Sequence, residues 1–241
     1  MINSAPLFCR TPTDWLTDPS LCWFEWQSLL AGILAVAAAG ASIHFLRKQI
    51  DQSERQENRR RSGNLSAARA LLPLAIVDAS QHAEDTAAAL MIVSSNVQAG
   101  YRDPDAPIEV DFPLPSQRIF DVFTRCIEWS DDVTLTEFLS EIISTIQVLS
   151  SRVATIGASP RQHRLAVNDY ILQCAIIDAL ALHLFPYARR EADVIQSDLS
   201  WDDVRQSLRR LRVNETAHPA VFVGIERREG RGAVPVDFLN F

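Results

Sequence analysis

Histidines and carboxylates are the residues of this chain best suited to acid–base or metal chemistry. Three groups combine a histidine with a nearby carboxylate: His82 with Glu84 and Asp85, His163 with Asp169, and His183 with Asp178. None of them has the i, i+4 histidine spacing or the Glu-x-x-His repeat that places metal ligands on one helical face. The sequence also contains no glycine-rich phosphate loop, no G-x-S-x-G motif and no C-x-x-C pair. We therefore expect no catalytic residue, no cofactor and no metal.

The strongest candidate for a polar site is the pair Asp178 and His183. Residues 170–185 are apolar nearly all round, which is typical of a helix buried at the centre of a bundle. An acid in such a helix needs a partner or a raised pKa. The simplest interpretation is a structural hydrogen bond from Asp178 to a neighbouring helix. The alternative is a buried polar site shared with His183, which would make the protein an enzyme.

The apolar stretch at residues 26–46 determines where the rest of the chain is expected to lie. Residues 27–46 carry no fixed charge, and a helix of about 20 residues is long enough to cross a hydrocarbon core of about 30 Å. The stretch therefore predicts a single transmembrane helix. The alternatives are a signal peptide, either uncleaved or cleaved near Ala39–Ala41, and a soluble core helix. The excess of acidic over basic residues before residue 26 disfavours the signal peptide.

Basic residues after this stretch set the expected topology. They are Arg47, Lys48, Arg55, Arg59, Arg60 and Arg61. Because Lys and Arg near a span stay in the cytoplasm, residues 1–25 should form a short extracytoplasmic tail, with the C-terminal domain inside. The expected location is thus a membrane that is crossed once, most simply a bacterial inner membrane. Residues 47–63 should form a basic juxtamembrane helix, whose cluster either binds anionic lipid at the membrane surface or only sets the topology.

The net charge limits the kinds of partner that we expect, and the positions of the cysteines limit their expected roles. The formal net charge of −7 argues against nucleic acid as a partner. Cys9 and Cys22 would lie outside, where they could pair in an oxidising compartment. Cys126 and Cys174 would lie inside as small buried hydrophobic residues. The expected partners are the lipid bilayer and a protein, which is either a different chain or a second copy.

Residues 64–213 should form an all-α cytoplasmic domain. After a hinge at Gly63 and Asn64, residues 65–98 predict a long helix with one seam: Leu72, Ile76, Ala79, Ala83, Thr86, Leu90, Val93 and Val97. This seam could pack within the bundle or form a parallel dimer. Prolines make residues 101–115 an extended connection.

Further helices are expected over residues 116–129 and 135–156, the second with a capping box between Thr134 and Glu137. Ser200 is the expected start of another helix, because acidic residues follow it. We expect no second membrane span in residues 170–185, because the stretch is short and contains Gln173, Asp178 and His183.

Residues 214–241 form the predicted C-terminal tail. Two valine-rich pieces, residues 221–223 and 234–236, flank a turn-prone segment and suggest a small hairpin. A tail that docks through Phe238, Leu239 and Phe241 is the alternative.

The predicted fold class is therefore all-α, with one N-terminal transmembrane helix followed by a cytoplasmic helical bundle. The expected function is that of a membrane-anchored, non-enzymatic interaction or scaffold protein. One alternative is a dimeric signalling module, associating through the seam and through small residues in the span, Ala31, Ala35, Ala39, Gly32 and Gly40. The second is an enzyme with a site near Asp178 and His183.

Overall fold

The structure of the chain is a computed structural model that describes residues 19–98, 110–156, 166–195, 199–230 and 234. Every regular element in these ranges is a helix, and none is a strand, which confirms the all-α fold class. The chain divides into two compact units, Met1–Arg60 and Arg61–Phe241. The long helix α2, Pro19–Gln98, contributes residues to both units.

In the first unit, the described structure is helical from Pro19 onward. The predicted helices at residues 26–46 and 47–63 both lie inside α2, because their alanine, leucine, glutamine, glutamate and arginine residues favour the helical state. Gly63 and Asn64 are also helical, so the hinge predicted there is wrong.

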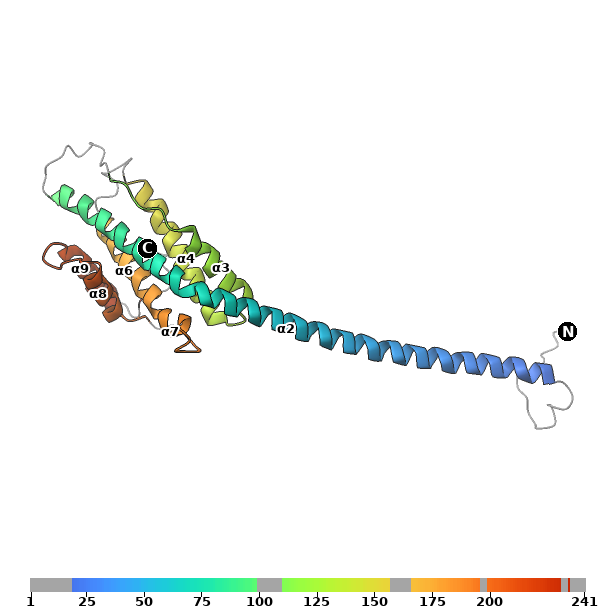
Figure 1. The fold of residues 1–241 in the computed structure, drawn as a ribbon. Coiled ribbons are helices and arrows are strands. Elements are labelled where there is room, and N and C mark those ends of the chain that lie inside the picture. The colour runs from blue at the N-terminus through green and yellow to red at the C-terminus, as the bar shows by residue number, and fades with distance from the viewer. Residues whose placement is uncertain (1–18, 99–109, 157–165, 196–198, 231–233, 235–241) are drawn as a thin grey trace. The chain divides into compact units, whose positions relative to one another are not determined.

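The second unit is a helical bundle (Figure 1). The later part of α2 is joined by α3 (Gln117–Trp129), α4 (Val133–Ala154), α6 (Val167–His183), the short α7 (Phe185–Ala188), α8 (Trp201–Arg210) and α9 (Pro219–Glu229). Residues 110–115, the described part of the predicted proline-rich connection, have no regular secondary structure.

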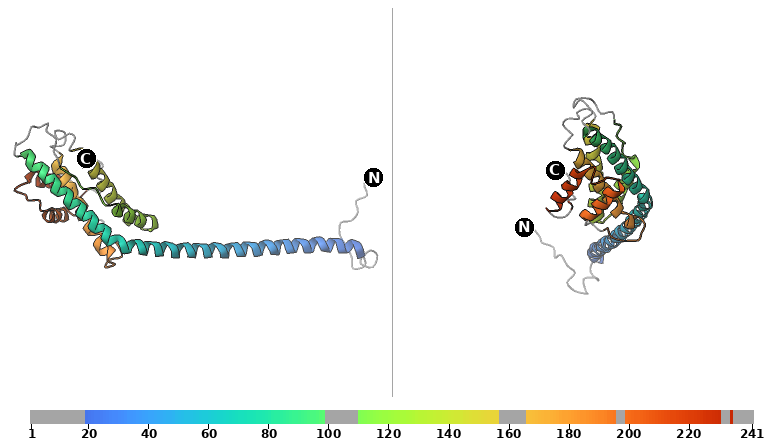
Figure 2. Two further views of the ribbon diagram at one scale, coloured as in Figure 1. Left: turned by 45° about the horizontal axis from the view of Figure 1, so that its top comes forward. Right: turned by 90° about the vertical axis from the view of Figure 1, so that its left-hand side faces the viewer.

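Helix α6 is the centre of this bundle. Every residue from Tyr170 to Ala181 is buried, and the helix packs against α4, α7, α8 and α9. It lies between α4 on one side and the α8–α9 pair on the other, as the views in Figures 1 and 2 agree. Its apolar character on all faces follows from this position, since it has no face left for water.

The seam of α2 is part of the same core. Leu72, Ile76, Ala79, Ala83, Thr86 and Leu90 are fully buried and Val93 is nearly so. The side chain of Val97 lies outside the described part of the structure. The small alanines let neighbouring helices come close, and the buried seam packs on the chain's own apolar core. Of the two interpretations, packing within the bundle therefore accounts for the seam.

The start of α4 differs from the expected one. The helix begins at Val133, and Asp132 is its N-cap, with Oδ1 accepting hydrogen bonds from Thr134 N at 2.9 Å and Leu135 N at 3.4 Å. The capping box predicted at Thr134 and Glu137 is therefore wrong, because the helix starts before Thr134 and Asp132 is its N-cap. The predicted start of α8 at Ser200 is confirmed.

The predicted C-terminal hairpin is also wrong over its described part. Residues 221–223 lie in α9, which begins at Pro219 and ends at Glu229. Val221 and Ile225 are buried one helical turn apart, and this i, i+4 contact with the core overrides the strand preference of valine. Phe238, Leu239 and Phe241, the residues of the alternative docked tail, lie outside the described residues.

Candidate functional site

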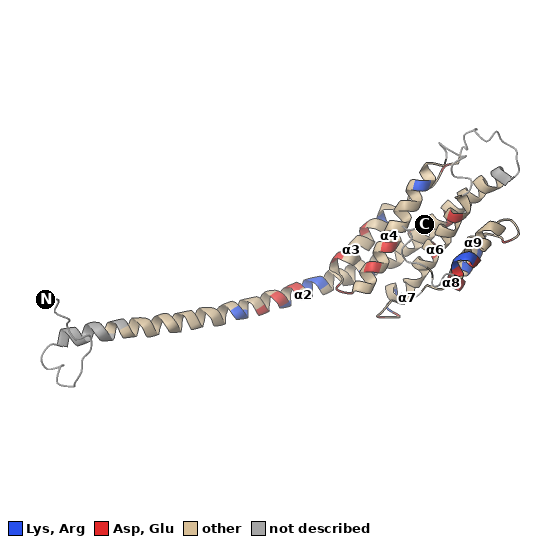
Figure 3. Cartoon of the chain, turned by 180° about the vertical axis from the view of Figure 1, so that it is seen from behind, with Lys and Arg blue, Asp and Glu red and all other residues tan. Residues whose placement is uncertain are grey.

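The apolar part of α2 in the first unit is exposed throughout its described side chains. The large apolar residues of this segment have exposed fractions from 53 to 74%: Leu29, Leu30, Ile33, Leu34, Val36, Ile43, Phe45 and Leu46. Figure 3 shows the segment as a run without charged residues, followed by alternating basic and acidic bands. An exposed apolar surface of this size is typical of a membrane or protein interaction site.

By length and composition, this long apolar helix near the N-terminus could cross a membrane. None of its most apolar window is buried within the chain. A signal sequence or the core helix of a soluble protein satisfies the same criterion. The segment Val167–Ala188 also satisfies it, but 78% of its most apolar window is buried, as expected for a core helix.

The helical geometry of α2 limits what the six predicted membrane-surface residues can do together. Arg47, Lys48, Arg55, Arg59, Arg60 and Arg61 are all exposed and all lie in this helix. At about 1.5 Å per residue, Arg59 lies about 18 Å along the axis from Arg47. That separation exceeds a Debye length of about 8 Å, so a helix standing upright on a membrane brings only Arg47 and Lys48 to the surface. Arg61 donates to Asp131 Oδ1 at 3.3 Å within the second unit.

Asp178, the candidate acid of the central helix, is 2% exposed. Ser80 Oγ on α2 donates to Asp178 Oδ1 at 2.5 Å, and Arg210 Nη2 on α8 donates to Asp178 Oδ2 at 2.5 Å. Arg210 Nη2 also donates to Ser207 Oγ at 2.8 Å. Each carboxylate oxygen thus has a donor from a different helix, which joins α2, α6 and α8 at one point.

His183 has a different partner. Its Nε2 lies 3.3 Å from Asp203 Oδ2 at the start of α8, and no contact between His183 and Asp178 occurs in the described structure. The two residues are separated by about 140° around the helix axis, because each residue of an α-helix advances about 100°. The predicted pair is therefore two separate contacts between α6 and α8.

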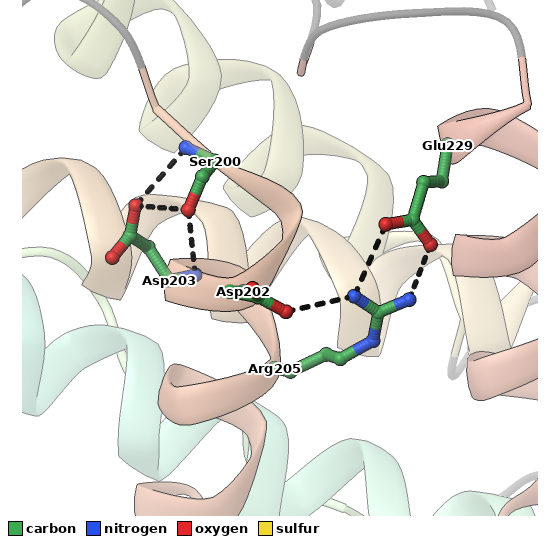
Figure 4. Close-up of polar contacts among 5 residues, drawn as sticks. All are labelled: Ser200, Asp202, Asp203, Arg205 and Glu229. Carbon is green, nitrogen blue, oxygen red and sulfur yellow. Dashed lines mark hydrogen bonds and ion pairs between the residues drawn. The ribbon is translucent and has the colours of Figure 1, made fainter.

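Asp203 belongs to the cap of α8. Ser200 Oγ accepts from Asp203 N at 3.2 Å, while Ser200 N and Oγ both donate to Asp203 Oδ2, at 3.0 and 2.6 Å (Figure 4). Burial raises the pKa of Asp203, but the hydrogen bonds from Ser200 and the proximity of His183 outweigh it, and the pKa lies below its usual value. Asp203 is therefore an anion that both caps α8 and attracts His183.

Ion pairs also hold α9 in place. Arg205 of α8 pairs with Glu229 of α9 and, at 3.0 Å, with Asp202 (Figure 4). Arg228 of α9 pairs with Asp169 of α6 at 2.9 Å. The last two helices are thus fastened to the bundle by charge as well as by their few buried apolar residues.

His82 is a buried histidine that contacts another helix. It is 5% exposed, its Nε2 lies 3.4 Å from Ser150 Oγ on α4, and its Nδ1 has no partner among the described residues. Burial lowers the pKa of His82, while the nearby Asp85 offsets part of this effect. Burial therefore favours the neutral form of the imidazole.

Cys126 and Cys174 are free and buried. Burial raises the pKa of the Cys126 thiol to about 11 and also raises the pKa of the Cys174 thiol. A nucleophilic cysteine requires the opposite shift, toward the thiolate. Among the described residues, no group of three or more His, Cys, Asp or Glu side chains could hold a metal ion.

Sequence reasoning missed the partners of the polar residues. Ser80, Arg210 and Asp203 carried no motif that linked them to Asp178 or His183, and Ser80 is 98 positions from Asp178. The only available signal was chemical: a buried acid requires a donor, and α8 is rich in arginine.

Comparisons with known proteins do not assign the chain to a family. No protein-family model matches it, and neither a curated protein nor a solved structure is significantly similar to it.

Proposed function

We propose that this chain is a single-pass membrane protein, with its N-terminus outside and its helical bundle in the cytoplasm, and that the bundle acts by binding another protein. The observation that carries the proposal is the uncharged segment of α2 at residues 27–46, whose large apolar side chains are more than half exposed. Moving one such side chain from water into an apolar medium contributes about 1.5–3 kcal/mol. A bilayer offers this gain to all of them at once.

The charge distribution supports the orientation. Arg47 and Lys48 directly follow the apolar segment, whereas residues 11–26 before it contain acidic residues and no basic ones. Basic residues close to a span are retained in the cytoplasm. The bundle that follows α2 would therefore be cytoplasmic.

The polar contacts favour a binding role over catalysis. Ser80 and Arg210 each donate to one oxygen of Asp178, and this arrangement favours a structural role for the carboxylate. His183 is directed to the anion Asp203 at the cap of α8.

Exposed apolar residues on the bundle part of α2 give a binding surface for the partner. Leu74, Val77 and Ile92 are 51, 51 and 54% exposed, and they lie on the side of the helix opposite the buried seam. The seam packs inside the bundle. If two copies of the chain associate, as in the alternative of a dimeric module, they would therefore do so through the apolar segment and not through the seam.

Membrane insertion can be tested with charged substitutions in the full chain. We expect wild-type protein in the membrane pellet, resistant to alkaline carbonate extraction. The double variant Leu34→Arg/Val36→Arg should move to the supernatant, since each arginine near the centre of a span costs about 2.5–3.5 kcal/mol. The matched control is Leu71→Arg/Leu74→Arg, on the same helix but outside the apolar segment, and it should remain in the pellet. Wild-type protein in the supernatant without detergent would refute the anchor, and a mature chain shortened at residues 39–41 would show a signal sequence.

Partner binding can be tested by site-specific photo-crosslinking in intact cells. A photoreactive residue at Leu74, Val77 or Ile92 should give a discrete crosslinked band of higher mass. The control positions are Glu137 and Gln147 of α4, which are exposed and polar, and they should give none. If no position on α2 crosslinks to protein, the interaction proposal fails even if the anchor stands.

A further inference from the structure

A pocket of about 310 Å³ opens between α4, α6 and α9. Its wall includes Arg152, Asp169, Leu172, Gln173, Ile176 and Arg228. The volume lies at the lower end of the range for small-molecule sites. Neither the membrane anchor nor the protein-binding surface uses this pocket.

Gln173 is the first sign that the pocket holds a ligand. Its side chain forms part of the wall although the residue is only 7% exposed, and its Oε1 has no hydrogen-bond partner among the described residues. A buried amide with an unmet hydrogen bond is unfavourable for folding. A half-turn about the terminal torsion exchanges the oxygen and the nitrogen, so a molecule in the pocket can be offered either an acceptor or a donor.

Arg152 is the second sign. It lies in the last turn of α4 and is half-buried, and its guanidinium has no ion pair or side-chain hydrogen bond with any residue that the structure describes. Arg228 across the pocket is already paired with Asp169 at 2.9 Å. The two arginines and one aspartate leave a local charge of about +1, carried by Arg152.

The rest of the wall is apolar. Leu172 and Ile176 are buried and lie one helical turn apart on the face of α6 that also carries Gln173. A ligand that fits must therefore combine a single negative charge with a hydrogen-bonding group and an apolar body. The lone guanidinium matches one carboxylate, and the neighbouring Asp169 opposes a dianion such as phosphate.

From this arrangement we propose that the pocket binds a small amphiphilic carboxylate, with its carboxylate on Arg152, its amide or hydroxyl on Gln173, and its apolar part along Leu172 and Ile176. The site makes the bundle a receptor for a small molecule, a role beyond membrane anchoring and protein binding. It is independent of both, because every residue in it belongs to the second unit.

Binding can be measured on the detergent-solubilised full chain by isothermal titration and ligand-observed NMR. The probes are N-acetyl-L-leucine and 4-hydroxyphenylacetate, each of which has one carboxylate, one hydrogen-bonding group and an apolar body. We expect a dissociation constant on the order of 1 mM or below for at least one. N-acetyl-L-leucinamide, which lacks the charge, and inorganic phosphate should bind at least about tenfold more weakly.

Two substitutions separate a binding role from a structural one. Arg152→Gln should weaken binding at least about tenfold, while the matched control Arg209→Gln, an exposed arginine of α8 outside the pocket, should not. Gln173→Met should weaken binding but leave the stability of the chain unchanged or higher, because it removes a buried amide with an unmet hydrogen bond.

The outcomes decide the proposal directly. Loss of binding in Arg152→Gln with retained binding in Arg209→Gln supports it. If neither probe binds at about 10 mM, if the neutral amide or phosphate binds as tightly as the carboxylates, or if Gln173→Met only destabilises the chain, the pocket is not the site we describe.

Discussion

Asp178 and Arg210 are 32 positions apart in the sequence, yet Arg210 Nη2 donates to Asp178 Oδ2 at 2.5 Å. The side chain of Asp178 is 3% exposed and that of Arg210 is 47% exposed. The pair therefore joins a buried anion of the central helix to a cation at the surface. This contact and that of Ser80 with Asp178 join α2, α6 and α8.

Removal of Arg210 should destabilise the bundle, because it leaves a buried carboxylate without its counter-ion. We expect Arg210→Met to lower the free energy of unfolding by about 2–3 kcal/mol, less than for a fully buried pair because water reaches the arginine. The neighbouring exposed Arg209 is the control, and Arg209→Met should change it by no more than about 0.5 kcal/mol. Urea unfolding of the detergent-solubilised chain, followed by circular dichroism, measures both values.

A double variant tests the physical reason for this loss. Asp178→Leu combined with Arg210→Met removes the buried charge as well as its partner, so it should be less destabilised than Arg210→Met alone. A double variant at least as unstable as the sum of the single changes would show that packing, and not charge, dominates at this site.

The seam of α2 should behave as part of the hydrophobic core of a single chain. Ala83 is fully buried, so Ala83→Leu should overpack the bundle and lower the free energy of unfolding by about 1–3 kcal/mol. Ala88→Leu, on the exposed side of the same helix, should change it by no more than about 0.5 kcal/mol. If Ala83→Cys forms disulfide-linked dimers under mild oxidation, the seam lies at an interface between copies, contrary to our expectation.

The N-cap of α4 can be tested by comparing substitutions at Asp132 and Thr134. Asp132→Ala should cost about 1 kcal/mol of stability, because the amides of Thr134 and Leu135 lose their acceptor. Thr134→Ala should cost clearly less, since its side chain does not cap the helix. Thermal unfolding of the two variants side by side measures the difference, and equal losses would argue against Asp132 as the cap.

His82 should make the bundle less stable in mild acid. Burial lowers the pKa of His82 below the ordinary value of 6.5, so the unfolded chain binds the proton more readily than the folded one. Stability is therefore full above about pH 6.5 and falls as the pH is lowered from there toward the folded pKa, by at most about 1.4 kcal/mol per pH unit for one proton.

The free energy of unfolding at about pH 7.5 and about pH 5.5 measures this dependence. The variant His82→Gln should show a smaller difference between the two conditions than the wild type. It should retain part of the difference, because burial also lowers the pKa of His218. A pH dependence identical to that of the wild type would assign the effect to other groups. The carboxylates with lowered pKa, Asp78, Asp203 and Glu229, titrate in a lower pH range and do not interfere.

The sequence by itself determined the features that depend on local periodicity and composition. Three local features could be predicted because each depends on neighbouring residues only: the helix over the uncharged residues 27–46, the helix at Gln117–Trp129 and the serine cap of α8. The burial of α6 could be predicted as well, since a helix that is apolar on all faces has to be enclosed. Local signals were weaker where two residues competed, as with Asp132 and Thr134 for the cap of α4.

Only the tertiary structure decided which residues meet. Valines at residues 221–223 became helical because Val221 and Ile225 face the core from one side of α9. The partners of Asp178 and the pocket beside Gln173 depend on contacts between helices distant in sequence. Such contacts are determined by packing and by the need to pair buried polar groups. Neither of these two requirements produces a recognisable pattern in one amino-acid sequence.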